Sequence, residues 1–119
     1  MEENKDIKER RKFPRAPVNV EILVYDSPSQ LTKGQGVLVF YTLDISVGGL
    51  FIETTVPLKI GSTIYLRFQL PGSPRIITTQ AKIVRTNDPH TELMQGMAAE
   101  FLHLSFEDKQ SIDEYVKNV

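Results

Sequence analysis

Residues 37–49 read Val37-Leu38-Val39-Phe40-Tyr41-Thr42-Leu43-Asp44-Ile45-Ser46-Val47-Gly48-Gly49. Every second residue from Val37 to Ile45 is apolar, which is typical of a strand with one buried face. The pattern predicts a strand over 37–45 whose inner face carries Val37, Val39, Tyr41, Leu43 and Ile45. Asp44 and Ser46 then share the outer face, and the two glycines lead into an antiparallel partner at 50–53.

The same alternation recurs along the rest of the chain. It predicts strands over 17–24, 64–70, 76–85 and 95–103, separated by polar connections such as 26–36 and by the turn at 71–74. Six short strands at this spacing predict an all-β fold, a six-stranded antiparallel β-barrel over residues 17–104 that is closed or nearly closed.

The sequence after residue 104 changes to a helical period. Ser105 to Asp108 resembles a capping box, with Asp108 where Glu or Gln is usual. The apolar residues that follow have the spacing of one helix face: Ile112, Tyr115, Val116 and Val119. This pattern predicts a C-terminal α-helix over 105–119 that packs its apolar side against the barrel or a partner.

Composition places the chain among ordinary globular proteins. It has 119 residues, 40% of them hydrophobic and 24% charged, which suits one domain with a real core. It has no cysteine, so disulfides and zinc–thiolate sites are excluded. The polar, acidic start is unlike a secretory signal, and no apolar run approaches the ~18 residues of a membrane span. We therefore expect a cytoplasmic protein.

The charge of the chain is unevenly distributed. The formal net charge is −1, yet residues 8–15 hold five Lys/Arg against one glutamate, a local net of +4. Residues 16–119 hold eight Lys/Arg against eleven Asp/Glu, a net of −3. Such a local positive potential fits a small anion better than a long nucleic acid.

The basic segment cannot be helical, because Pro14 restricts Phe13 to extended geometry. In an extended chain Arg11 and Arg15 point to the same side, about 13 Å apart. Guanidinium groups bind phosphate and the O6/N7 edge of guanine bidentately. The alternative is a solvated basic leader in front of the barrel, and this segment taken alone favours that alternative.

The turn after the 37–45 strand has two interpretations as well. Asp44 and Ser46 are predicted on an outer face that also carries Leu38, Phe40 and Thr42, and an apolar outer wall ending in polar groups is typical of a binding surface. A simple hairpin turn is the alternative, and it is favoured by this segment alone.

Considered together, the two segments resemble a known signature. Arg11-x-x-x-Arg15 followed by Asp44-x-Ser46-x-x-Gly49 is similar to the two-part motif of the PilZ domain family, six-stranded barrels that bind the bacterial messenger cyclic di-GMP. The similarity covers most of the chain. It continues in Gly49-Leu50-Phe51, Leu58-x-x-Gly61, Ala81-Lys82-Ile83-Val84-Arg85 and Gly96-Met97-x-x-x-Phe101.

The resemblance implies a cyclic di-GMP receptor with a mobile segment 1–16, in which ligand binding orders residues 10–15 against the surface of residues 44–49. The signal would then be read by a partner protein or by a change in self-association. Its ligand-binding residues would be Arg10, Arg11, Arg15, Asp44, Ser46, Gly48 and Gly49. The arginines would hold phosphate and the guanine edge, and Asp44 would accept hydrogen bonds from guanine. Arg10 implies an intercalated pair of messengers. The resemblance implies no further cofactor and no metal.

Other functions have weaker support in the sequence. One alternative is a PilZ-like adaptor that contacts proteins without the nucleotide, although such relatives usually lack the arginines. A second is a barrel that binds single-stranded nucleic acid, which would need aromatic residues among basic ones along a groove. His90 and His103 have no catalytic or metal-binding partners at suitable spacing, so we expect no enzyme. Arg67, Arg75 and Arg85 could extend the anion surface, but a solvated strand position is the favoured interpretation of each.

Overall fold

The computed structural model describes residues 13–87 and 95–119. Its elements follow the chain in this order: β1 Ala16–Pro17, β2 Glu21–Tyr25, α2 Pro28–Lys33, β3 Leu38–Ile45, β4 Gly49–Glu53, β5 Thr63–Gln69, β6 Ile76–Thr86, β7 Gly96–His103 and α3 Phe106–Lys117. Within these described ranges, no helix is long and apolar enough to cross a membrane.

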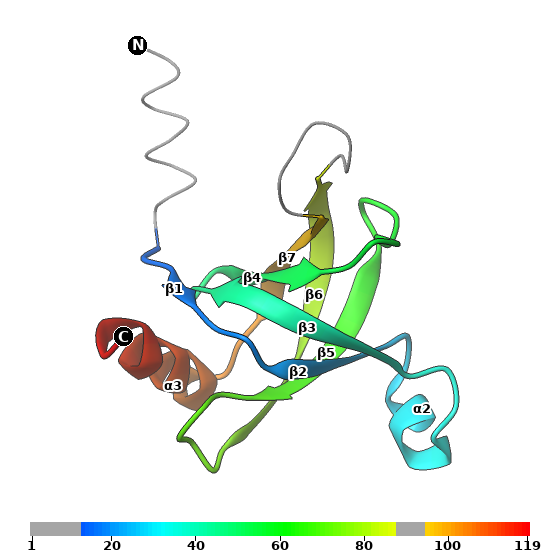
Figure 1. Ribbon diagram of the computed structural model, residues 1–119. Coiled ribbons are helices and arrows are strands. Elements are labelled where there is room, and N and C mark those ends of the chain that lie inside the picture. The colour runs from blue at the N-terminus through cyan, green and yellow to red at the C-terminus, as the bar shows by residue number, and fades with distance from the viewer. Residues whose placement is uncertain (1–12, 88–94) are drawn as a thin grey trace.

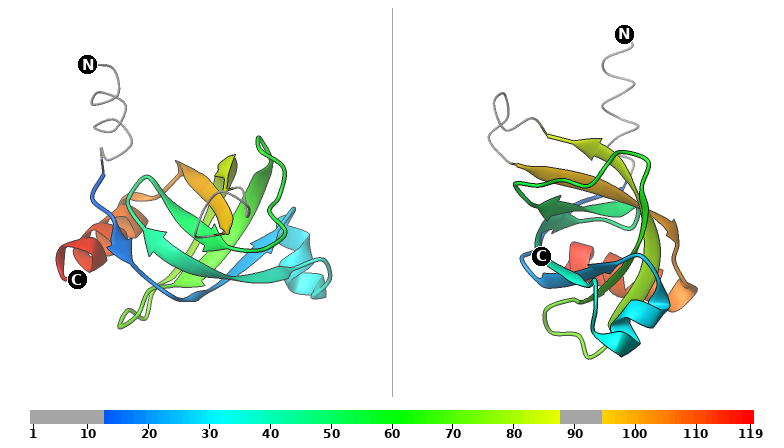
Figure 2. Two further views of the ribbon diagram at one scale, coloured as in Figure 1. Left: turned by 45° about the horizontal axis from the view of Figure 1, so that its top comes forward. Right: turned by 90° about the vertical axis from the view of Figure 1, so that its right-hand side faces the viewer.

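The strands form one antiparallel sheet that closes on itself. Its order is β1-β3-β2-β5-β6-β7-β4, and a further pairing of β3 with β4 joins the two ends. Six strands therefore make a closed barrel, while the short β1 pairs with the end of β3 (Figures 1 and 2). The predicted all-β barrel with a C-terminal helix is confirmed.

Alternate residues of the strands fill the interior. The core includes residues from β2, β4, β5, β6, β7 and α3, among them Ile22, Leu50, Leu66, Ile83, Met97 and Ile112, all of which are fully buried. Burying one such aliphatic side chain contributes about 1.5–3 kcal/mol. The apolar alternation in the sequence thus supplies the barrel's main stabilisation.

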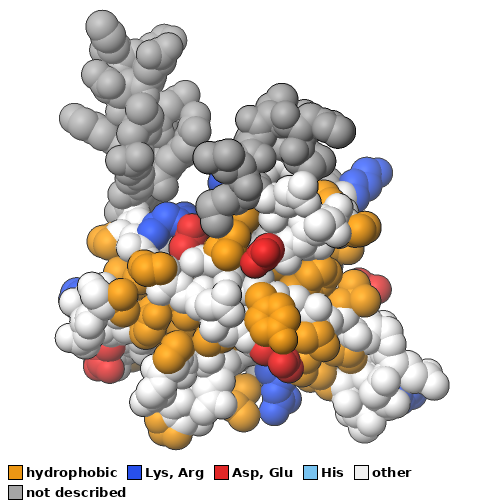
Figure 3. All heavy atoms as spheres, in the orientation of Figure 1, with side chains coloured by type: hydrophobic (Ala, Val, Ile, Leu, Met, Phe, Trp, Pro, Cys, Tyr) orange, Lys and Arg blue, Asp and Glu red, His pale blue; other side chains and the backbone are white. Residues whose placement is uncertain are grey.

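The inner face predicted for β3 is partly wrong. Val39 and Tyr41 are 53% and 51% exposed, whereas Thr42 is fully buried. Thr42 pairs with Ile52 of β4 and Asp44 with Phe51, so Leu43 is one residue in excess. This β-bulge shifts the alternation, because Thr42 faces inward before it and Ile45 after it. Figure 3 shows the hydrophobic side chains that remain on this outer face of the molecule.

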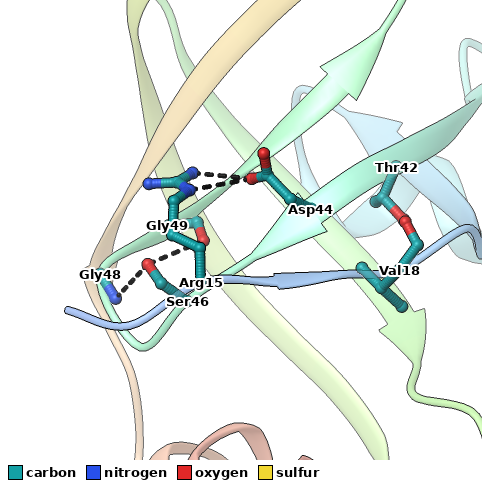
Figure 4. A network of polar contacts seen from close by, with 7 residues as sticks. All are labelled: Arg15, Val18, Thr42, Asp44, Ser46, Gly48 and Gly49. Carbon is teal, nitrogen blue, oxygen red and sulfur yellow. Dashed lines mark hydrogen bonds and ion pairs between the residues drawn. The ribbon is translucent and has the colours of Figure 1, made fainter. Parts of the chain in front are cut away.

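Thr42 also explains why the predicted strand 17–24 divides into β1 and β2. Its hydroxyl group donates to the Val18 carbonyl oxygen at 3.0 Å and accepts from the Val20 amide at 3.1 Å (Figure 4 shows the contact with Val18). The hydroxyl thus bonds backbone groups where the strand is interrupted, which satisfies a buried polar side chain.

The long polar connection 26–36 contains the short helix α2. Pro28 occupies the first turn, where a missing amide hydrogen costs nothing. Gly34 ends the helix in a left-handed conformation with φ of 67°. No residue of α2 is buried, and the helix lies on the other side of the molecule from α3 (Figure 1).

Helix α3 is fixed to the barrel by polar contacts as well as by Ile112. The Ser105 hydroxyl accepts from the Asp108 amide at 3.1 Å, and the Asp108 carboxylate accepts from Arg75 Nε at 2.7 Å. The Tyr115 hydroxyl donates to the Pro17 carbonyl oxygen at 2.8 Å. The predicted helix is confirmed, except that Val119 lies beyond its end and is exposed.

Glycine is required where β4 meets β7. A Cβ atom at Gly49 would lie far closer to the Ala99 carbonyl oxygen than van der Waals contact allows, and one at Gly96 would meet the Ile52 carbonyl oxygen in the same way. Gly49 and Gly96 stand at the two ends of this strand pair. The close approach of the two backbones therefore depends on them.

Replacing Gly49 by alanine should lower the free energy of unfolding by about 1–3 kcal/mol, because backbone atoms must move to admit the methyl group. The matched control is Gly48→Ala, whose new methyl group would meet only the side chain of Phe13, which is partly exposed and can turn away. Urea denaturation of both variants measures the difference. An equal loss at both positions would contradict this account of Gly49.

Replacing Arg75 by glutamine should lower the free energy of unfolding by about 1–2 kcal/mol, because the buried Asp108 carboxylate loses its charged donor. The control is Lys117→Gln, which removes the exposed pair with Asp113 on the same helix. Thermal and urea denaturation should show no measurable change for the control. A wild-type-like Arg75→Gln protein would show that this ion pair does not hold α3.

Candidate ligand-binding site

An ion pair joins the two sequence motifs. Arg15 Nε lies 3.0 Å and Nη2 2.9 Å from the same Asp44 oxygen, Oδ1 (Figure 4). The short strand β1 brings them together, since Pro17 is paired with Asp44 and Ala16 with Ile45. Residues 29 positions apart in the chain thus meet on the barrel surface.

The bulge in β3 turns Asp44 outward. Strict alternation from the buried Thr42 would direct Asp44 into the core, but the extra residue Leu43 reverses the phase. The side chains of Arg15 and Asp44 are 41% and 37% exposed. An ion pair this exposed contributes about 0–1 kcal/mol, so a ligand can replace it at little cost.

Ser46 does not lie on an open outer face as its position in the pattern predicted. It is 2% exposed, and its hydroxyl accepts from the Gly48 amide at 3.1 Å. The same hydroxyl donates to the Gly49 carbonyl oxygen at 3.4 Å, and the Ser46 amide donates to that oxygen at 2.8 Å (Figure 4). Ser46 therefore fixes the turn between β3 and β4.

A pocket of about 640 Å³ opens beside this turn. Volumes of this order hold small organic ligands. Its lining residues come from the segment before β1, the β3–β4 turn, β4, β6, β7 and α3: Phe13, Arg15, Ser46, Val47, Gly48, Gly49, Val84, Arg85, Ala98, Ala99, Glu100, Phe101 and Lys109. Asp44 stands outside this lining and is linked to it through Arg15.

The pocket has an uncharged base and charged borders. Gly48, Gly49, Ala98 and Ala99 supply small surfaces where β4 pairs with β7. Around them the lining holds three cations and one carboxylate, namely Arg15, Arg85, Lys109 and Glu100. A concave surface with an excess of positive charge attracts anions.

The predicted site residues divide into two groups. The structure brings Arg15, Asp44, Ser46, Gly48 and Gly49 together at one place. Arg10 and Arg11 lie outside the described residues, as does His90. In the described part of the chain, no cluster of three or more His, Asp or Glu could hold a metal ion.

Two cations of the lining were not identified as site residues from the sequence. The sequence favours a solvated strand position for Arg85 over an extension of the anion surface, and it carries no signal for Lys109. Their place in the pocket depends on a bulge in β6 and on where α3 packs, and neither feature has a signal in the local pattern. The solvated strand position predicted for Arg75 is wrong, because Arg75 lies just before β6 and pairs with Asp108 of α3.

Comparisons with known proteins agree with this architecture. The PilZ domain family model matches residues 9–118. The structure of an inhibitor of motility from Bacillus subtilis, MotI/DgrA, is similar over 92% of this chain, with 23% identity and a TM-score of 0.71. This chain spans only 50% of that protein. No curated protein gave a significant match.

Two isolated PilZ domains are similar over nearly their whole length. The PilZ domain with c-di-GMP of YcgR from Escherichia coli matches 92% of this chain and 90% of its own, with 17% identity and a TM-score of 0.65. That of CeSA from a cellulose-synthesizing bacterium matches 87% and 95%, with 18% identity and a TM-score of 0.57. At such identities the similarity shows a common fold.

The family match adds to the structural one, since it extends over nearly all of the chain. It includes both motifs, Arg11-x-x-x-Arg15 and Asp44-x-Ser46-x-x-Gly49, and members of the family are receptors and adaptors rather than enzymes. The chain belongs to the PilZ domain family.

Proposed function

We propose that this chain is a receptor for cyclic di-GMP that signals to a partner protein when its N-terminal loop, residues 10–15, changes conformation on the bound ligand. The observation that carries the proposal is the ion pair between Arg15 and Asp44, which joins the two motifs at the border of a cationic pocket. The PilZ domain of YcgR, which has the same fold, is described with c-di-GMP, and this supports the choice of ligand.

The chemistry of the site suits a phosphate-bearing guanine nucleotide. A guanidinium group binds phosphate, or the O6/N7 edge of guanine, through two parallel hydrogen bonds. A carboxylate such as that of Asp44 accepts hydrogen bonds from the nitrogen donors of guanine. The small residues Gly48, Gly49 and Ala98 leave room for a flat base against the strands.

Binding requires the Arg15–Asp44 pair to change partners. Two Arg15 donors, Nε and Nη2, now contact one oxygen of Asp44. A ligand that offers phosphate to Arg15 and ring donors to Asp44 replaces one exposed contact by two complementary ones. Until a ligand replaces this contact, Arg15 and Asp44 neutralise each other's charge.

The N-terminal arginines complete the proposed site. Arg10 and Arg11 precede Phe13, which lines the pocket and packs over Gly48. Pro14 keeps this part of the chain from joining a helix, so the arginines can close over a ligand from the open side. The closed segment presents a new surface, which we propose the partner protein recognises.

Substitution of Arg15 or Asp44 by alanine should weaken cyclic di-GMP binding tenfold or more, since a lost charged contact costs about 1.5–3 kcal/mol. Isothermal titration calorimetry measures this. Arg67→Ala is the control, because Arg67 lies on β5 away from the pocket lining and should leave affinity unchanged. Wild-type affinity in both site variants would refute the assigned roles, and a wild type that shows no binding would favour the nucleotide-independent adaptor.

Arg10 determines ligand number in the proposed receptor. The wild type should bind two intercalated cyclic di-GMP molecules per chain and Arg10→Ala one, because the second molecule loses its cationic partner. The titration plateau in calorimetry, checked by equilibrium dialysis, gives the stoichiometry. A plateau at one ligand per wild-type chain would exclude the intercalated pair and leave the receptor itself in place.

A further inference from the structure

Two β-bulges border the pocket, one on each side of the β4–β7 pair. The bulge in β3 turns Asp44 outward, as described above. The second lies in β6, where Ile83 pairs with Ala99 and Arg85 pairs with the next residue, Ala98, leaving Val84 in excess. In the order β6-β7-β4-β3 the two bulges therefore occupy opposite borders of one surface.

The bulge in β6 decides where Arg85 points. The odd-numbered residues before it face the core, and these are Ile77, Thr79, Ala81 and Ile83. Strict alternation would send Arg85 inward as well, where an unpaired guanidinium group is very costly. The extra residue Val84 places Arg85 on the outer surface instead, and both residues line the pocket.

Lys109 reaches the same border from α3. It follows Asp108, whose contacts with Ser105 and Arg75 hold the first turn of the helix on the barrel. Acidic residues stabilise the first turn of a helix, so helix stability does not account for a lysine at position 109, close to that turn. Lys109 lines the pocket together with Arg85.

Arg85 and Lys109 differ from Arg15 in their charge partners. Among the residues that the structure describes, the ion pairs are those of Arg15 with Asp44, Arg75 with Asp108 and Lys117 with Asp113. Arg85 and Lys109 thus form no ion pair within this part of the chain. Both can bind an anion without first releasing a carboxylate. Glu100, the carboxylate of the lining, leaves it with a net charge of two positive units.

We propose that Arg85 and Lys109 form a second anion-binding wall, which contacts a phosphate group of the bound nucleotide on the side of the pocket away from Asp44. This inference rests on the proposed function. Cyclic di-GMP carries two phosphates on opposite sides of its ring, so it can contact Arg15 with one and the second wall with the other. The uncharged base of the pocket, formed by Gly48, Gly49, Ala98 and Ala99, separates the two contacts.

The second wall connects ligand binding to the C-terminal helix. Lys109 belongs to α3, and the Tyr115 hydroxyl of the same helix donates to the Pro17 carbonyl oxygen, two residues after Arg15. A ligand held by Arg15 and by the second wall therefore links the N-terminal segment, the barrel and α3. The partner would then meet a surface to which both ends of the described chain contribute.

The test is calorimetric titration of cyclic di-GMP into Arg85→Met and Lys109→Met, which remove charge but keep an apolar stem. We expect each to weaken binding about five- to tenfold, in the range of one charged contact at a partly exposed site. Arg67→Met on β5 and Lys117→Met on α3 are the matched controls and should bind as the wild type does. Urea denaturation should give wild-type midpoints for both wall variants.

Salt dependence distinguishes a phosphate contact from a merely structural role. Near 1 M salt the Debye length is about 3 Å, so the difference in affinity between wild type and the wall variants should shrink. A loss of affinity that is independent of salt would overturn the proposal. Wild-type affinity in both wall variants, with Arg15→Ala still defective, would overturn the second wall alone. If the wild type does not bind, the receptor and the wall fail together.

Discussion

Strand β3 carries the constraint on which the rest of the structure depends. It pairs with β1, β2 and β4, so its register sets the position of three other strands. Because side chains alternate strictly along a strand, one extra residue at Leu43 changes which side chains enter the core on either side of it. The bulge allows Thr42 and Ile45 to be buried while Asp44, between them, reaches the surface beside Arg15.

Much of the barrel could be predicted because its strands follow simple rules. The alternation over 64–70 and 76–83 and the helical spacing that includes Ile112 each reflect a local period, and the core uses them as the patterns indicate. The inner face of β3 could not be predicted, since Val39 and Tyr41 are apolar yet exposed and Thr42 is polar yet buried. Contacts across the sheet stabilise a bulge, and the local sequence pattern carries no information about those contacts.

The candidate site likewise contains residues that the sequence could predict and residues that it could not. Arg15, Asp44 and the glycines could be found because they form a spaced motif with its own chemistry. Ser46 belongs to the same motif, but its predicted position on an open outer face is wrong, because its hydroxyl turns back to bond Gly48 and Gly49 and so shapes the turn. Arg85 and Lys109 are brought to the pocket by the β6 bulge and by the packing of α3, which are properties of the folded chain.

The stability of the barrel and the proposed ionic contacts with the ligand therefore use different residues around the turn between β3 and β4. Gly49 lets β4 approach β7 closely and Ser46 closes the turn through bonds to Gly48 and Gly49. Arg15 and Asp44 hold each other only through an exposed ion pair. A ligand can exchange that weak contact while the turn beneath it stays rigid, which is the arrangement that a preorganised binding site requires.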